Sequence, residues 1–127
     1  MRTGLCISLL LLAATIAAGM VSAGEIGRVS ARYVSAAEEL SVMTEKHDWE
    51  RAAQTVAAYL DSWRDTVPAL QTLINHEDTD SVTLSLLQLQ AAIRAQDEAG
   101  CFTACAELRE NALHLYHRDG FSWANVL

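Results

Sequence analysis

The sequence predicts an all-α protein, with an N-terminal hydrophobic helix followed by an antiparallel up-and-down bundle of three to four helices. Two features of the 127-residue chain support this fold class. Residues from Thr3 to Gly24 carry no charge. Beyond them, four segments place apolar residues at alternating spacings of three and four, which puts these residues on one helical face. Proline occurs only once, at Pro68, as expected for a helical and not a turn-rich β composition.

The apolar opening has two interpretations. As a helix, its most apolar part, Leu5 to Val21, is about 26 Å long, between the lengths typical of a signal peptide and of a membrane span. Val21-Ser22-Ala23 has the small residues of a cleavage site. Residues 1–23 are therefore predicted to be a single transmembrane anchor or a signal peptide. Residues 24–127 are expected to form a helical-bundle domain outside the cytoplasm, held at the cell membrane, or exported if cleavage follows Ala23.

The charge of the remaining chain limits its partners. Arg2 is the only charged residue before Glu25, so the rest holds eight basic and sixteen acidic residues. Such an acidic domain repels phosphate backbones, and we expect no nucleic-acid partner. Outside the leader the only cysteines are Cys101 and Cys105, four residues apart, which does not indicate a disulfide scaffold.

The first two helices follow directly from the pattern. The segment after the leader should continue it as one helix in the anchored form. Its apolar stripe is Ile26, Val29, Tyr33, Ala36, Leu40 and Met43. Asp48 is a good N-cap for the second helix. The second stripe, which we expect to pack like a coiled-coil seam, is Trp49, Ala53, Val56, Leu60, Trp63, Val67, Leu70 and Ile74.

The third and fourth helices are separated by shorter signals. We predict a turn from Asn75 to Asp80, with Asp78, Thr79 or Asp80 capping a helix that runs to about Gln96. Its stripe is Val82, Leu86, Leu89 and Ile93, widened by Leu84, Leu87 and Ala91. Asp97 should cap a fourth helix that stops at Gly120, and residues 121–127 should fold back onto the bundle. The fourth stripe is Cys101, Cys105, Leu108, Ala112 and Leu115.

Two clusters of possible metal ligands stand out. His76, Asp78 and Asp80 form the densest one, with Glu77, and are the candidate cation ligands. Capping of the third helix explains the same residues, and the glycine and spacing of a calcium loop are missing. Cys101 and Cys105 lie about 40° apart on a helix, whereas His114 and His117 point to the opposite side. We therefore interpret the cysteines as core residues and predict no metal.

The remaining candidates are aromatic or terminal. Trp49 and Trp63 lie two heptads apart on one stripe and either line a ligand pocket or pack in the core, with core packing favoured. Together with Trp123 and Asn125 they are the candidate anchors for packing or for a partner. The chain has no phosphate loop, zinc-protease motif or nucleophile elbow, so no catalytic residue and no cofactor are predicted, and we do not expect an enzyme.

Several of these residues together resemble a family of small bacterial proteins known as domain of unknown function 4363. The shared features, in order, are the apolar N-terminus, Asp48-Trp49 with Ala52-Ala53, Trp63 ahead of Pro68, His76, Asp80 and the closing Asn125-Val126-Leu127. The resemblance covers essentially the whole chain. It implies a single-pass or exported helical protein and supplies no activity.

The sequence leaves two functions open. The first is a non-enzymatic accessory or interaction module of the bacterial cell envelope, whose partner is another envelope or membrane protein or a second copy. The second is an extracytoplasmic sensor of a small ligand or cation, using the acidic cluster at His76 or a pocket near the tryptophans. Ligand-dependent stabilisation distinguishes them.

Overall fold

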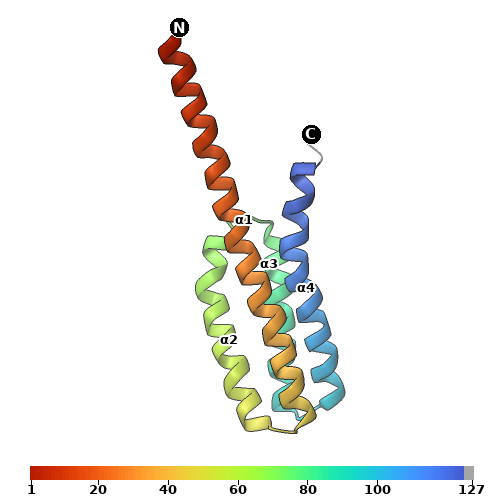
Figure 1. The fold of residues 1–127 in the computed structure, drawn as a ribbon. Helices are drawn as coiled ribbons and strands as arrows, with labels where there is room; N and C mark the ends of the chain where they lie inside the picture. Colours follow the sequence, from red (N-terminus) through yellow and green to blue (C-terminus); the bar gives the residue numbers. More distant parts are fainter. Residues whose placement is uncertain (125–127) are drawn as a thin grey trace.

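The computed structural model describes residues 1–124, except for the side chains of Arg2 and residues 117–124. Within this part the chain forms four helices and no strand (Figure 1). They are α1 (Arg2–Glu45), α2 (Trp49–Leu70), α3 (His76–Arg94) and α4 (Glu98–Ala124). The all-α prediction is confirmed.

The four helices form an up-and-down bundle. Each helix packs against the one before it, and α1 also packs against α4, which closes the ring. The contact between α1 and α4 is the most extensive in the bundle. The contact between α1 and α2 is the smallest of the four. Short turns between consecutive helices make neighbours antiparallel, so both chain ends leave the bundle on the same side (Figure 1).

Helix α1 is a single helix of 44 residues that joins the leader to the bundle without a break. The predicted continuity of the two is confirmed. Leader side chains such as Leu10 and Val21 are exposed, and Ile26 is the first buried apolar residue along the chain. The leader therefore projects from the bundle as a free apolar rod (Figure 1).

The core consists largely of the predicted stripes. The fourth stripe is wholly buried, as are Val82, Leu86, Leu89 and Ile93 of α3. The second seam is narrower than predicted, because Trp49, Ala53 and Val67 of α2, and Ile74 beyond its end, are only partly buried. The largest fully buried side chains include Tyr33, Leu40, Trp63, Leu86, Leu89 and Leu108.

A side-chain hydrogen bond joins each pair of neighbouring helices. The pairs are Tyr33 Oη to the Tyr59 carbonyl (3.2 Å), Trp63 Nε1 to Thr83 Oγ1 (2.8 Å), Asn111 Nδ2 to Ser85 Oγ (2.7 Å) and Ser30 Oγ to the Ala112 carbonyl (2.7 Å). A buried polar group without a partner is costly, so these pairs favour one register of the helices over others that would bury the same apolar area.

The two turns at the end of the bundle opposite the leader, here called the distal end, have the same backbone. In the first, the amide of Asp48 donates to the Met43 carbonyl, and in the second the amide of Asp97 donates to the Ala92 carbonyl. The residue before each aspartate is left-handed, with φ of 53° at His47 and 52° at Gln96. Both turns are therefore Schellman motifs with a non-glycine residue at the left-handed position.

Three helices begin at a polar cap, two of them predicted. The Asp48 carboxylate accepts from the Arg51 amide at 3.4 Å, and the Asp97 carboxylate accepts from the Gly100 amide at 3.1 Å. A Cβ at Gly100 would collide with the Asp97 carboxylate, which explains a glycine in this first turn. The cap of α3 is Asn75, whose side chain accepts from the Glu77 amide. The predicted turn over 75–80 is therefore wrong, because Asn75 supplies the cap and the helix starts at His76.

Three further boundaries or faces differ from the prediction. Helix α2 ends at Leu70, two residues after Pro68, and not at Ile74. Leu84 and Leu87 are 57% and 40% exposed, so they do not widen the core face of α3. Ala91 is also exposed.

Helix α4 continues through Gly120 to Ala124, since α-helical hydrogen bonding tolerates an interior glycine at a cost of about 1 kcal/mol. Residues 121–124 thus extend the helix and do not fold back.

Candidate functional site

The candidate site is a groove between α1 and α2, the least closely packed pair of helices. It has a volume of about 400 Å³. Its walls are Arg32 and Glu39 from α1 and Gln54, Thr55, Ala58 and Tyr59 from α2. Arg32 and Glu39 are seven residues apart, two helical turns, so they lie on the same side of α1. The groove therefore places one cation and one anion along a single wall, about 10 Å apart along the helix.

Tyr59 links the charged residues of this groove. Its hydroxyl donates to Glu39 Oε2 at 2.7 Å, and the Arg32 Cζ atom lies 6.0 Å from the centroid of its ring. The hydrogen bond to the Glu39 carboxylate, together with burial, raises the pKa of Tyr59 to about 12. The phenol is therefore a neutral hydrogen-bonding group at physiological pH, and no general-base role is available to it.

A buried aromatic cluster supports the groove from below. The Tyr33 ring meets the Tyr59 ring edge-on, with centroids 5.9 Å apart, and meets the Trp63 ring edge-on at 5.0 Å. Trp63 is fully buried, and its indole N–H is held by Thr83. Burial also raises the pKa of the Tyr33 hydroxyl. The Tyr59 ring packs edge-on against Tyr33, its hydroxyl is bonded to Glu39, and its backbone carbonyl is bonded to Tyr33. These contacts fix the position of Tyr59, so the groove is preorganised.

The chemistry of the groove suits binding. Guanidinium and carboxylate groups at fixed spacing, with amide and hydroxyl groups between them, can hold the two ends of a small zwitterion. Neither Arg32 nor Glu39 is buried, so a ligand there keeps contact with water. Thr55 and Tyr59 supply the hydroxyl groups of the groove, and that of Tyr59 is held by Glu39.

The acidic cluster lies at the start of α3. His76 and Asp80 are exposed and one helical turn apart, and Asp78 is partly buried about 200° around the helix from His76. Asp78 already interacts with another group of the protein. Among the described residues, no group of three histidine, cysteine or acidic side chains is placed to hold one metal ion. The cation hypothesis at His76, Asp78 and Asp80 gains no support from this arrangement.

The cysteines of α4 lie where their stripe placed them. Cys101 and Cys105 are free thiols in the core, 0% and 3% exposed. Desolvation by burial raises the pKa of both thiols. His114 is exposed on another side of α4, and the side chain of His117 lies outside the described residues. The structure therefore keeps Cys101 and Cys105 apart from His114.

The proposed anchors divide into three cases. Trp63 is fully buried, which confirms the favoured prediction that it packs in the core. Trp49 is partly buried and stacks on His47, with ring centroids 5.9 Å apart. The Trp123 side chain and all of Asn125 lie outside the described residues.

Sequence reasoning missed Arg32, Glu39 and Tyr59. Tyr59 lies beside the α2 seam, next to Leu60, so its periodicity marks it as a surface position. Glu39 is equally unremarkable on the outer side of α1. Only the antiparallel pairing of α1 with α2 brings the two within hydrogen-bond distance, and no local pattern encodes that pairing.

One segment is long and apolar enough to cross a membrane. It lies at the start of α1, and its most apolar stretch is not buried against the bundle. By length and composition alone, a signal sequence near the N-terminus meets the same description. The fold thus defines a class of protein: a four-helix up-and-down bundle carried by an apolar N-terminal helix.

The chain belongs to the family described as domain of unknown function (DUF4363), whose model matches residues 20–126. The match begins within the leader and includes the bundle part of α1 and all of α2, α3 and α4, so the resemblance noted in the sequence is confirmed. No curated protein matches the chain. No solved structure matches it.

Proposed function

We propose that this protein is a membrane-tethered, non-enzymatic helical module of the cell envelope, with its bundle outside the cytoplasm. One observation carries the proposal: the exposed apolar leader and the first bundle helix are one uninterrupted helix. The two hydroxyls within the most apolar part of the leader, Leu5 to Val21, are already hydrogen-bonded. Ser8 donates to the Gly4 carbonyl and Thr15 to the Leu11 carbonyl. Such internal pairing suits a helix within a bilayer, where water is absent.

The outer face of α3 is the surface we propose for the partner, which is another membrane protein or a second copy. Leu84 and Leu87 lie about one turn apart there and are 57% and 40% exposed. Ala91 continues the same face. By contrast, the seam of α2 is used inside the bundle. Exposed leucines grouped on one helix face are a common feature of protein interaction sites.

Membrane fractionation of the full chain tests the tether. The chain should remain in the membrane fraction after alkaline extraction, and a chain starting at Gly24 should be soluble. Recovery of the full chain in the soluble fraction would contradict the proposal. For the partner, a photo-crosslinker at Leu87 should give a specific adduct, whereas one at exposed His114 on α4 serves as the matched control. Equal labelling from both positions would count against an α3 interface.

A second candidate function is ligand sensing in the groove between α1 and α2. The observation favouring it is the fixed triad of Arg32, Tyr59 and Glu39. We infer that its ligand is a small zwitterion, and not a cation bound at His76 or Asp80. A panel of amino acids and short peptides should raise the melting temperature through binding to the folded state. The variant Arg32→Gln should lose the response, and Arg94→Gln, an exposed arginine at the distal end, should keep it.

A further inference from the structure

We propose that the end of the bundle nearest the leader is a second membrane contact. In this arrangement, the turn over residues 71–75 rests in the headgroup layer of the bilayer, and the last turns of α4 cross that layer. The inference rests on the proposed function, in which the leader crosses that bilayer. It adds that the bundle stands end-on against the membrane, at a fixed height and orientation.

The distance between the bundle and the bilayer follows from the continuity of α1. Ile26 is already buried in the core, three residues after Ala23. At about 1.5 Å per residue, this first core layer lies only about 5 Å beyond the leader. The headgroup layer on each side of a bilayer is roughly 5–7 Å thick. A helix without a linker cannot bend the bundle away, so the top of the bundle is within reach of the headgroups.

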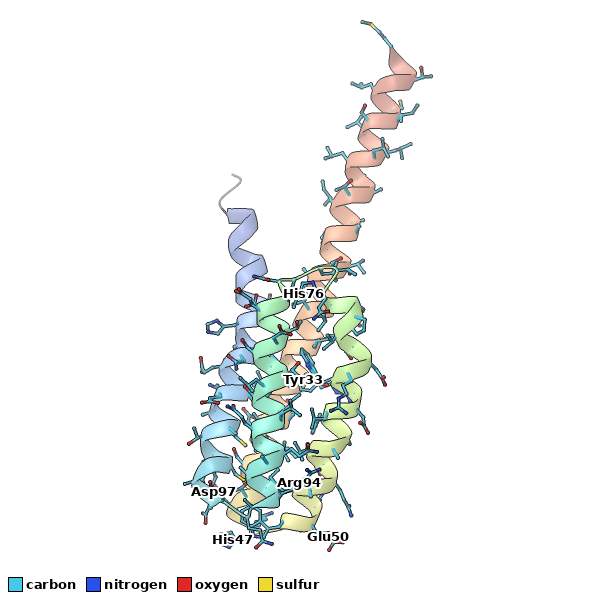
Figure 2. The ribbon with its side chains drawn as sticks, turned by 180° about the vertical axis from the view of Figure 1, so that it is seen from behind. Tyr33, His47, Glu50, His76, Arg94 and Asp97 are labelled. Carbon is cyan, nitrogen blue, oxygen red and sulfur yellow. The ribbon has the colours of Figure 1, made fainter. Side chains whose placement is uncertain are left out.

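The α2–α3 turn lies at this same level. The part of α1 from Gly24 to Glu45 and the whole of α2 both span 22 residues, and they run antiparallel from the turn at 46–48. Leu70, the last residue of α2, is therefore level with Gly24. Figure 2 shows His76, which follows the turn, at the end from which the leader projects. The turn over 71–75 thus faces the membrane.

The composition of this turn fits a lipid surface. Its residues, Gln71-Thr72-Leu73-Ile74-Asn75, carry no charge, and Leu73 is 45% exposed. The opposite, distal end is charged: His47, Glu50, Arg94 and Asp97 gather there (Figure 2). Burial of the exposed part of Leu73 in the lipid surface would favour contact at this uncharged turn.

Helix α4 reaches further toward the membrane than α3. Both helices meet at the distal turn, but α3 has 19 residues and α4 has 27, so the backbone of α4 extends about 12 Å past the start of α3. A Cβ at Gly27 would lie 3.3 Å from the Tyr116 ring, which places Tyr116 level with the top of the bundle. The sequence after it contains Phe121 and Trp123, and aromatic residues are enriched at membrane interfaces.

The charges near this end select the kind of lipid. Arg28 is paired with Glu25, so its charge is largely balanced. Glu77 and Asp78 lie in the first turn of α3, just below the turn over 71–75. Acidic groups there repel anionic headgroups, so we expect contact with a zwitterionic surface.

Depth measurements on the full chain in phosphatidylcholine vesicles test the inference. The background carries Cys6→Ser, and the buried Cys101 and Cys105 stay unlabelled in the folded chain. Environment-sensitive probes are placed one at a time at Thr72→Cys, Ser122→Cys, Ala95→Cys at the distal end, and Ala13→Cys in the leader. Lipids that carry a spin label in the headgroup region then quench each probe according to its depth. We expect quenching at positions 72 and 122 to exceed quenching at 95 by several fold.

The outcomes separate the two proposals. If the probe at 13 reports lipid while those at 72 and 122 behave like the one at 95, the second contact is overturned and the tether stands. If the probe at 13 reports water, the tether fails and the second contact fails with it. In addition, Leu73→Glu should reduce quenching at 72 about twofold and leave position 13 unchanged. Val42→Glu, at an apolar residue of nearly the same exposure (46%) in the distal part of α1, should change neither. Equal effects of the two variants would also overturn the contact.

Discussion

His47 and Glu98 join the two turns at the distal end of the bundle, with Nε2 and Oε2 2.8 Å apart. His47 belongs to the turn between α1 and α2, and Glu98 is the first residue of α4. The same imidazole stacks on Trp49. These contacts help to hold His47 in its left-handed backbone conformation, which non-glycine residues rarely adopt. Gln96 occupies the matching position of the second turn with nearly the same φ.

Replacing Gln96 by glycine should stabilise the protein. A left-handed residue with a Cβ costs roughly 1–2 kcal/mol, part of which glycine recovers, so we expect the free energy of unfolding to rise by about 0.5–1 kcal/mol. Urea unfolding of the detergent-solubilised chain, followed by helical circular dichroism, measures the change. His47→Gly is the control: it relieves the same backbone strain but loses the Trp49 and Glu98 contacts, so its gain should be smaller. A loss of stability in Gln96→Gly would contradict this account of the turn.

The His47–Glu98 pair should contribute little by itself. Both side chains are at least half exposed, at 59% and 50%, and exposed pairs typically contribute about 0.2–1 kcal/mol. A double-mutant cycle with His47→Ala and Glu98→Ala should give a coupling energy in that range, weakening in high salt. A coupling above about 2 kcal/mol would mean that the pair is shielded from solvent in a way that this exposure does not allow.

Tyr59 should titrate at unusually high pH. Since the Glu39 carboxylate and burial raise its pKa from 10.0 to about 12, its phenolate absorption should appear about two pH units late. The linked stability is fully present below pH 10 and is lost as the pH rises toward 12, because the unfolded chain ionises first. Ultraviolet titration, with Tyr59→Phe to assign the signal, measures this pKa. Glu39→Gln should lower it, and an unchanged value in that variant would refute the role given to the carboxylate.

The thiols of Cys101 and Cys105 should be inert in the folded chain. Burial raises the pKa of both, and the thiolate is the reactive form. In a Cys6→Ser background, an aromatic disulfide reagent should release almost no colour until denaturant is added, and should then report two thiols. Rapid reaction of either cysteine without denaturant would place it at the surface, against the position of α4 described above.

The two tryptophans of α2 should differ sharply in their effect on stability. Trp63→Phe removes buried volume and the hydrogen bond to Thr83, so the free energy of unfolding should fall by about 1–3 kcal/mol. Trp49→Phe changes a partly exposed ring that stacks on His47, and should cost less than about 1 kcal/mol. The same urea experiment compares them. Equal costs would show that Trp63 is not the aromatic centre of the core.

The sequence predicted the fold through features that are local along the chain. Helical periodicity placed Leu86, Leu108 and Cys105 in the core, and Asp48 and Asp97 marked two helix starts. Periodicity was misleading where apolar residues lie outside the stripe. Leu84 and Leu87 looked like core residues, but the core of a four-helix bundle accepts only one narrow face of each helix.

The candidate site depends on information that a single sequence does not carry. Glu39 and Tyr59 are 20 positions apart and meet only because α1 and α2 pair in one register. That register depends on buried hydrogen bonds such as Tyr33 to the Tyr59 carbonyl, which no spacing rule indicates. The start of α3 was misplaced for a simpler reason, since Asn75 competes with Asp78 and Asp80 as a cap and all three are good capping residues.

The central claim is that the leader stays attached and holds the bundle at the membrane. The most direct test is the intact mass of the chain recovered from the membrane fraction of cells that express it in full with a C-terminal tag. The account predicts a single species that retains residues 1–23. A product that begins at Gly24, found outside the membrane fraction, would contradict the tether and leave an exported bundle.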